Sequence, residues 1–374
     1  MKAHATAPVA NMTVMSTPEC KNGLECPWLK RGTCKKNHSE KTEKEKCKNG
    51  PCCRWQKLGI CRFDHPETAT VAKASVAKAS VAKASVCFSD FTLTKSLGHG
   101  MSGDVMLGVH KKTSERIAIK RINTKKLGTQ VSEILQIEIC ILRKISGHEG
   151  VSQLLFVENT PSETQIGLEL IENGELFDYI DTAGYLSESI ARTIFLQLGS
   201  ALNHCHDNNI YHRDIKLENI LLDSRFRIKL IDFGLSTMTE TYDAPITGRC
   251  GTPQYCAPEV WTNTTYSGIK ADTWSALVVL FLMLSGNYAF GDKAARGYYY
   301  YDILETRFWE KHKKIAPHLP DRTEYLFFKG FMSNPRRRDP IKEILCDPWF
   351  LAPPIAEEEF IAKMTEIKQK IVKR

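Results

Sequence analysis

The sequence of 374 residues lacks any long apolar run and any recognisable secretory leader. Its longest strongly apolar stretch is the nine residues Ala276–Leu284, whereas a membrane-spanning helix needs about 20. Residues 1–20 contain no continuous apolar segment, so they do not resemble a signal peptide. Hydrophobic residues make up 42% and charged residues 25% of the chain, which excludes a mostly disordered protein. We therefore expect a globular protein with no membrane partner, inside the cell in the cytoplasm, the nucleus or both.

Beyond its first quarter, the chain has no excess of positive charge. Residues 1–88 carry 16 Lys and Arg against 7 Asp and Glu, while residues 89–374 carry 35 against 36. A basic segment on a neutral body is typical of a polyanion-binding module, although a solvated basic arm explains it equally well. The cysteines divide in the same way, because seven of the 13 lie between Cys20 and Cys61 and the others are scattered singly. This clustering favours metal binding over a disulfide scaffold.

The clustered cysteines belong to two copies of a repeat with a period of 27 residues, residues 20–38 and 47–65. Each copy has the pattern C-x5-C-x7-C-x3-H, and three thiolates with one imidazole form a closed tetrahedral set that suits structural Zn²⁺. Segments this short need the metal to fold. Cys52 and Cys53 are both available in the second copy, and the repeat register selects Cys53. The predicted ligands are Cys20, Cys26, Cys34 and His38, and then Cys47, Cys53, Cys61 and His65.

This segment resembles tandem CCCH zinc fingers, a family whose members commonly bind single-stranded RNA. Trp28, Trp55 and Phe63 offer faces on which bases could stack, and the neighbouring Lys and Arg side chains could contact phosphates. The resemblance implies single-stranded RNA as a partner of residues 20–65. Docking of a protein is the alternative, with the tryptophans packing the small finger cores.

The rest of the chain divides by composition. We predict a flexible leader at 1–19, the finger module at 20–66, a low-complexity linker at 67–88 built on VAKAS repeats, a large domain at 89–350 and a tail at 351–374. The tail is predicted to be an amphipathic helix that packs on the large domain or docks a partner. Its apolar positions are Phe360, Met364, Ile367 and Ile371.

The large domain carries a series of motifs in a fixed order. They are LGHGMSGDV at 97–105, IAIK ending at Lys120, a helix-like run with Glu138, YHRDIKLEN at 211–219, IDFG at 231–234 and RCGTPQYCAPE at 249–259. Together they resemble the signature of eukaryotic-type protein kinases. A dinucleotide-binding interpretation of the glycines fails, because they lead into a hairpin-like segment and a lysine. The resemblance implies an α+β fold with the two lobes of a protein kinase.

The resemblance also implies ATP and Mg²⁺ as cofactors and assigns a role to each matching residue. Asp214 would accept the substrate proton or orient the hydroxyl, and Lys216 would contact the γ-phosphate. Lys120 would hold the α- and β-phosphates, aimed by Glu138, and Asn219 and Asp232 would bind Mg²⁺. The positions that match ATP-binding residues are Leu97, Gly98, Gly100, Gly103, Val105, Ala118, Lys120, Glu169, Ile171, Glu175 and Leu221.

Lys216 and Thr252 match Ser/Thr kinases, and ENGELFDYI with DPWF resembles the calmodulin-dependent and checkpoint kinase group. Glu175 and Glu218 match acidic positions that read upstream basic residues, which implies protein substrates with Ser or Thr near Arg or Lys. An RNA-binding scaffold with an inactive kinase fold is the rival, although such folds usually lack Lys120, Asp214 or Asp232.

Further positions match structural residues of the family, and two depart from it. Glu259 and Arg338 are expected to form a buried ion pair, and Asp272 is expected to fix the backbone of the YHRD segment. Leu277 stands where the family usually has Gly, which should change helix packing but not chemistry. Gly248 stands where the family usually has a phosphorylated residue, so control by phosphorylation of this loop is in doubt.

Overall fold

A computed structural model of the chain describes residues 87–100, 103–124, 129–290 and 308–373. The chain divides into two compact units, Met1–Val76 and Ala77–Arg374, and all described residues belong to the second unit. The predicted leader, the finger module with its eight zinc ligands, and the linker up to residue 86 lie outside the described residues.

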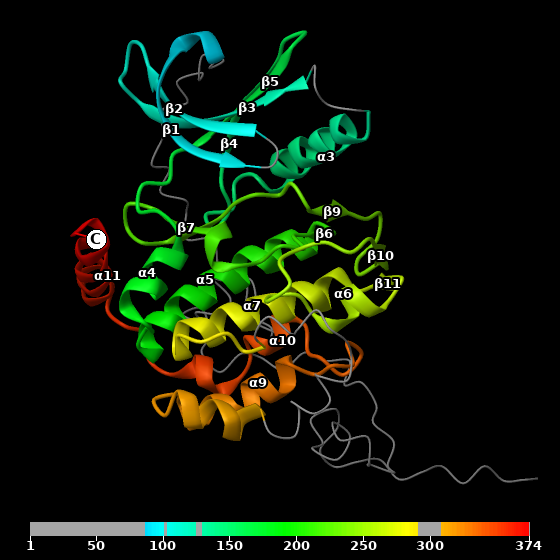
Figure 1. Ribbon diagram of the computed structural model, residues 1–374, viewed down its shortest axis with the longest axis vertical. Helices are drawn as coiled ribbons and strands as arrows, with labels where there is room; N and C mark the ends of the chain where they lie inside the picture. Colours follow the sequence, from blue (N-terminus) through cyan, green and yellow to red (C-terminus); the bar gives the residue numbers. More distant parts are fainter. Residues whose placement is uncertain (1–86, 101–102, 125–128, 291–307, 374) are drawn as a thin grey trace, which may run out of the picture. The chain divides into compact units, whose positions relative to one another are not determined.

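The described part begins with a five-stranded antiparallel sheet in the order β1-β2-β3-β5-β4 and one helix, α3 (Thr129–Ile145). The strands are β1 (Phe91–Gly100), β2 (Gly103–His110), β3 (Arg116–Asn123), β4 (Leu154–Asn159) and β5 (Glu163–Glu169). Figure 1 shows α3 beside this sheet at one end of the unit. Because neighbouring strands in the sheet are antiparallel, short hairpin connections suffice between β1, β2 and β3.

The alternation of side chains along β3 places one face of this strand toward α3. Ile117 and Ile119 pack in a cluster with Phe91 on one face of the sheet. Ile122 packs with α3 in a second cluster, through Leu135 and other buried residues. Since successive side chains of a strand point to opposite faces, Lys120 shares the face of Ile122 and points toward α3.

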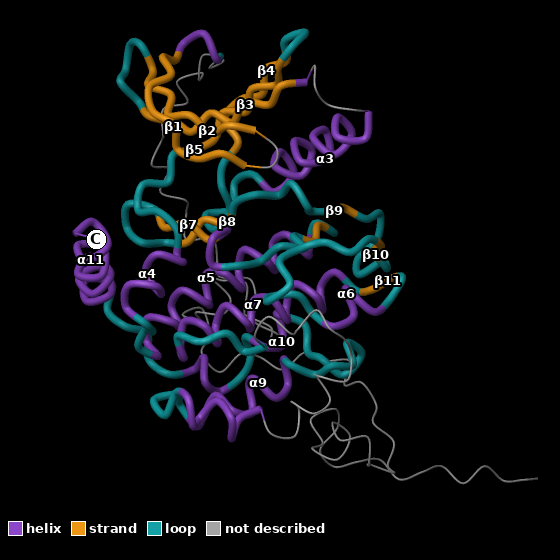
Figure 2. The backbone as a smooth tube through the Cα atoms, in the orientation of Figure 1, coloured by secondary structure: helices purple, strands orange, loops and turns teal. Residues whose placement is uncertain are grey.

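The remainder is mainly helical, with short two-stranded pairs between the helices (Figure 2). The helices are α4 (Leu176–Ala183), α5 (Glu188–Asp207), α6 (Pro258–Thr262), α7 (Gly268–Ser285), α9 (Glu324–Gly330) and α10 (Ile341–Ile344). The short strands are β6 (Ile210–Tyr211), β7 (Ile220–Leu222), β8 (Ile228–Leu230), β9 (Thr237–Met238), β10 (Ile246–Thr247) and β11 (Thr265–Tyr266).

Helix α7 forms the centre of this helical part. It starts at the Ser267 cap, whose hydroxyl accepts a hydrogen bond from the Lys270 N–H, and it ends at Gly286 in the left-handed conformation. Among the described helices, α7 is long and apolar enough to cross a membrane, but 94% of it is buried inside the fold. A helix that is apolar on all sides is expected in such a core.

The tail segment forms α11 (Glu357–Lys373), whose first turn is acidic and whose last turn is basic, as suits the helix dipole. Phe360 and Met364 are buried, and α11 packs on α4. Figure 1 shows it beside α4 as the last helix of the chain. The tail therefore packs on the large domain, which is the first of the two roles predicted for it.

Candidate active site

Lys120 on β3 and Glu138 on α3 form a buried ion pair. The Lys120 Nζ donates a hydrogen bond to Glu138 Oε1 at 2.6 Å, and neither side chain is more than 10% exposed. The register of the sheet places Val105 of β2 opposite Lys120, so the apolar side chain and the cation lie on neighbouring strands. Because an unpaired charge at such a position would be costly, the pair fixes the ammonium relative to α3.

The glycine-rich segment forms the hairpin between β1 and β2. Gly98 lies opposite Val105, and Gly100 lies opposite Gly103, while the two residues of the turn lie outside the described part. Gly103 has a φ of +145°, and a Cβ there would lie 2.3 Å from the carbonyl oxygen of Arg121. Only glycine permits this approach of β2 to β3. Of the other predicted ATP positions here, Leu97 on β1 is exposed and Ala118 on β3 is half-buried.

The segment from His212 to Asp214 is held by a buried carboxylate on α7. Asp272 accepts hydrogen bonds from the backbone N–H of His212 at 2.9 Å and of Arg213 at 2.8 Å, and it lies 2.9 Å from His206 Nε2. Burial acts to raise the pKa of Asp272, but His206, His212 and the hydrogen bond from the Arg213 N–H together outweigh burial, and the pKa is lowered. The predicted role of Asp272 in fixing this backbone is therefore confirmed.

Asp214 is the centre of a hydrogen-bond network. Its Oδ2 lies 2.8 Å from Lys216 Nζ and accepts a hydrogen bond from Asn219 Nδ2 at 3.1 Å. Its Oδ1 accepts hydrogen bonds from the Thr252 N–H at 2.9 Å and the Thr252 hydroxyl at 2.8 Å. Burial acts to raise the pKa of Asp214, but the hydrogen bonds from Lys216 and Thr252 and the nearby Lys216 and His212 charges together outweigh burial, and the pKa is lowered. The carboxyl is therefore an ionised acceptor at neutral pH.

The two predicted Mg²⁺ ligands, Asn219 and Asp232, present suitable oxygen atoms. Asn219 donates from Nδ2 to the backbone carbonyl of Asp214 at 2.8 Å, which leaves its amide oxygen as the group available to a cation. Asp232 is exposed and has a φ of +60°, while the following Phe233 is buried against His212. Within the described residues, no group of three or more His, Cys, Asp or Glu side chains is arranged so that it could hold a metal ion. Mg²⁺ does not need one, because it often binds one or two protein oxygens and takes its other ligands from phosphates and water.

The predicted adenine-contacting segment follows β5. The Glu169 carboxylate lies 2.8 Å from Lys229 Nζ on β8 and accepts a hydrogen bond from the Gln153 N–H at 2.9 Å. The backbone of Glu175 pairs with Leu221 of β7 in an isolated antiparallel β-bridge. Ile171 is half-buried and lies in the chain between Glu169 and Glu175. The role of Lys229 was not predicted, although a lysine within the apolar run IKLI signals a buried cation that needs a partner.

Arg213 connects the YHRD segment to the loop that precedes α6. Its Nη2 donates hydrogen bonds to the carbonyls of Thr247 at 2.9 Å and Gly248 at 2.7 Å, and its Nε donates to the Tyr266 hydroxyl at 3.1 Å. The Tyr266 hydroxyl donates to the same Gly248 carbonyl at 3.0 Å. This end of the loop is therefore held by neutral acceptors.

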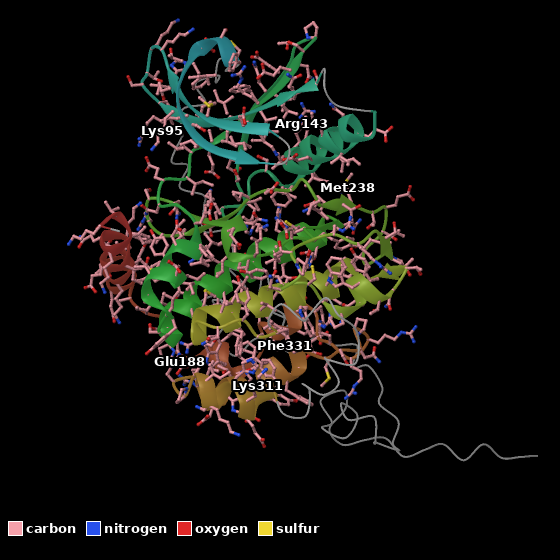
Figure 3. All side chains as sticks on the ribbon, in the orientation of Figure 1. Lys95, Arg143, Glu188, Met238, Lys311 and Phe331 are labelled. Atoms are coloured by element: carbon pink, nitrogen blue, oxygen red, sulfur yellow. The ribbon has the colours of Figure 1, made fainter. Side chains whose placement is uncertain are left out.

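Two further contacts hold the elements around the site. Arg338 and Glu259 form the expected bidentate ion pair, at 2.5 Å and 3.0 Å, with both side chains fully buried. In the last turn of α3, the Lys144 Nζ donates a hydrogen bond to the Asn208 carbonyl at 2.9 Å and lies 3.6 Å from the Met238 sulfur. Figure 3 labels Met238 on the strand below α3. The end of α3 is thus tied to the helical part.

Comparison with known proteins agrees with this geometry. A family model described as the protein kinase domain matches residues 91–350. CBL-interacting serine/threonine-protein kinase 26 of Arabidopsis thaliana is 36% identical over 283 residues, which cover 74% of this chain and 63% of that protein. CBL-interacting protein kinase 31 of Oryza sativa is 34% identical, with 74% and 62% covered. The SNF1-related protein kinase catalytic subunit alpha KIN12 of Arabidopsis thaliana is 37% identical, with 70% and 51% covered. The chain thus spans less than two thirds of the length of these relatives.

Proposed function

Because the chain belongs to the protein kinase domain family, we propose that it is a Ser/Thr protein kinase that transfers the γ-phosphate of ATP to protein hydroxyls. The observation that carries the proposal is the simultaneous presence of the Lys120–Glu138 ion pair and the ionised Asp214 network. An inactive scaffold has no need for both. Gly234 lies so close to the pair that a Cβ there would be 3.8 Å from Glu138 Oε2, which brings the Asp232 segment to the same place.

In this proposal, catalysis consists of positioning and charge neutralisation. Lys120 holds the α- and β-phosphates, and Asp214 accepts a hydrogen bond from the substrate hydroxyl. The Lys216 ammonium, held 2.8 Å from Asp214, can neutralise charge on the transferred phosphoryl group. Asn219 and Asp232 would hold Mg²⁺, which neutralises the charge of the β- and γ-phosphates when bound.

The test is transfer of radiolabelled γ-phosphate from ATP to a Ser/Thr peptide by the full chain, with Asp232→Ala as the matched variant. We expect transfer that the substitution abolishes while the protein stays folded. Folded wild-type protein that binds Mg²⁺–ATP but transfers no phosphate would support the scaffold alternative.

We also propose a preference for basic residues near the target hydroxyl. Burial and the nearby carboxylates of Asp178 and Glu218 raise the pKa of Glu175. The Glu175 carboxyl, whose ionisation these two neighbours disfavour, would gain from a substrate Arg or Lys. A peptide array should show enrichment of upstream Arg or Lys, and Glu175→Gln should reduce it. A profile without that enrichment would contradict this preference.

For residues 20–65 we propose two structural zinc sites and binding of single-stranded RNA, carried by the repeated C-x5-C-x7-C-x3-H pattern and the basic charge of this segment. Metal analysis of the full chain should give two Zn²⁺ per molecule, and replacing Cys34 and Cys61 with Ser should remove them. RNA affinity should fall steeply with salt, because phosphate contacts release counterions. Binding of a protein with no binding of RNA would favour the docking alternative.

A further inference from the structure

Helix α11 lies beyond the matched family domain, which ends at residue 350, and yet it reaches back to the segment that follows β5. Its buried residues Phe360 and Met364 pack on the domain, and α11 contacts α4. Figure 1 shows α11 beside α4, on the side of the fold where the segment after β5 connects the sheet to the helical part. The helix is therefore placed to act on that connection.

The contact is made by Lys368. Its Nζ donates a hydrogen bond to the backbone carbonyl of Glu172 at 3.2 Å and a second one to Asn173 Oδ1. Both acceptors are neutral, and burial lowers the pKa of this lysine. The ammonium thus gives up part of its hydration for two oxygens of one short turn, which a solvated surface lysine would not do.

The turn at Glu172 and Asn173 directly follows Ile171, whose backbone is expected to meet adenine. The Asn173 side chain and backbone are tied to the helical part, while the Glu172 carboxylate is tied to the sheet. The Asn173 carbonyl accepts a hydrogen bond from the Tyr179 hydroxyl on α4, and its N–H and Nδ2 donate to the carbonyls of Leu222 and Asp223. The Glu172 carboxylate pairs with Arg116 on β3. Lys368 adds a contact from outside the family domain to a turn that already joins its two parts.

We propose that Lys368 is a positioning residue that fixes the Glu172–Asn173 turn, and with it the backbone that binds adenine. This inference rests on the proposed kinase function. A backbone segment that is already ordered loses less conformational freedom when a ligand binds. Removing the contact should therefore weaken nucleotide binding and leave phosphoryl transfer and peptide recognition unchanged.

The experiment compares the full chain with Lys368→Met, which keeps the hydrocarbon stem, and Lys368→Arg, which keeps the charge and donors. Lys363→Met is the control, because Lys363 on the same helix pairs with Glu359 at 2.6 Å on the exposed surface. Each protein is assayed for the KM of ATP, the KM of peptide, kcat and the Kd of adenosine. Amide hydrogen exchange of residues 169–175 is measured without nucleotide.

We expect Lys368→Met to raise the KM of ATP and the Kd of adenosine about fivefold, equivalent to about 1 kcal/mol, and to speed exchange in residues 169–175. Lys368→Arg should restore most of the affinity, and Lys363→Met should match the wild type. Unchanged affinity, or equal effects of the two Met variants, would overturn the inference, as would a loss of all parameters together with stability. If the wild type bound ATP but transferred no phosphate, the proposed kinase function would fail, while faster exchange and weaker binding in Lys368→Met would still support the contact.

Discussion

The departure at Leu277 gives a prediction that can be worked out from the structure. Leu277 of α7 is fully buried and packs against Gly330 of α9. A Cβ on Gly330 would lie 1.8 Å from Leu277 Cδ1 and 3.2 Å from its Cγ. The larger residue on one helix is thus accommodated by a glycine on the other. Gly330→Ala should therefore overpack this contact.

Overpacking of a core costs about 1–3 kcal/mol, and Ala gains at most about 1 kcal/mol over Gly from helix propensity. We expect Gly330→Ala to lower the free energy of unfolding by about 1–2 kcal/mol. Leu277→Ala should cost about 2–5 kcal/mol, because it leaves a cavity. In the double variant the new methyl group occupies part of that cavity, so its cost should be about 1–3 kcal/mol less than the sum.

The assay is equilibrium urea unfolding of the four proteins, with kcat and the KM values measured on folded samples. The kinetic constants should stay close to the wild type, because the contact joins two helices and touches none of the proposed catalytic side chains. Strict additivity of the two substitutions would refute the packing argument. A loss of kcat in the folded Gly330→Ala protein would refute the expectation that the departure leaves the chemistry unchanged.

Two further predictions concern charged groups. Lys216→Met removes the cation that lowers the pKa of Asp214 and leaves the opposing effect of burial, so the acid limb of the residual pH–rate profile should move to higher pH; an unmoved limb would exclude this account. Glu259→Gln leaves the Arg338 charge buried without a counter-charge and should destabilise the protein by about 3–5 kcal/mol, measured as a lower urea midpoint; an unchanged midpoint would show that the pair contributes little.

The sequence predicts a contact correctly where a motif specifies both the residue types and the residues that they contact. Lys120 and Glu138 could be paired from the sequence, because both stand at positions to which the kinase resemblance assigns that contact. Asp272 could be assigned to the YHRD backbone because its position matches a structural residue of the kinase family. The structure shows both contacts directly.

Contacts between elements far apart in the chain were harder to predict, because packing and not local pattern decides them. Lys229 and Glu169 are 60 positions apart, and Lys368 and Glu172 are 196 positions apart. In the first case, a lysine in an apolar strand indicates a partner but does not identify it. In the second, the spacing of apolar residues in the tail predicts a packed face but does not show what that face covers.

Gly248 shows how a departure from a family pattern acquires a physical meaning in the structure. A loop phosphate would order this segment by pairing with an arginine, and glycine cannot carry one. Here the Gly248 carbonyl accepts hydrogen bonds from Arg213 and from Tyr266. Its φ of +87° favours glycine, and a Cβ there would come within 3.3 Å of Arg213 Nη2. Gly248 thus stands in place of the usual phosphate acceptor and also lets the backbone approach Arg213. This end of the loop is therefore ordered by hydrogen bonds, without an added negative charge.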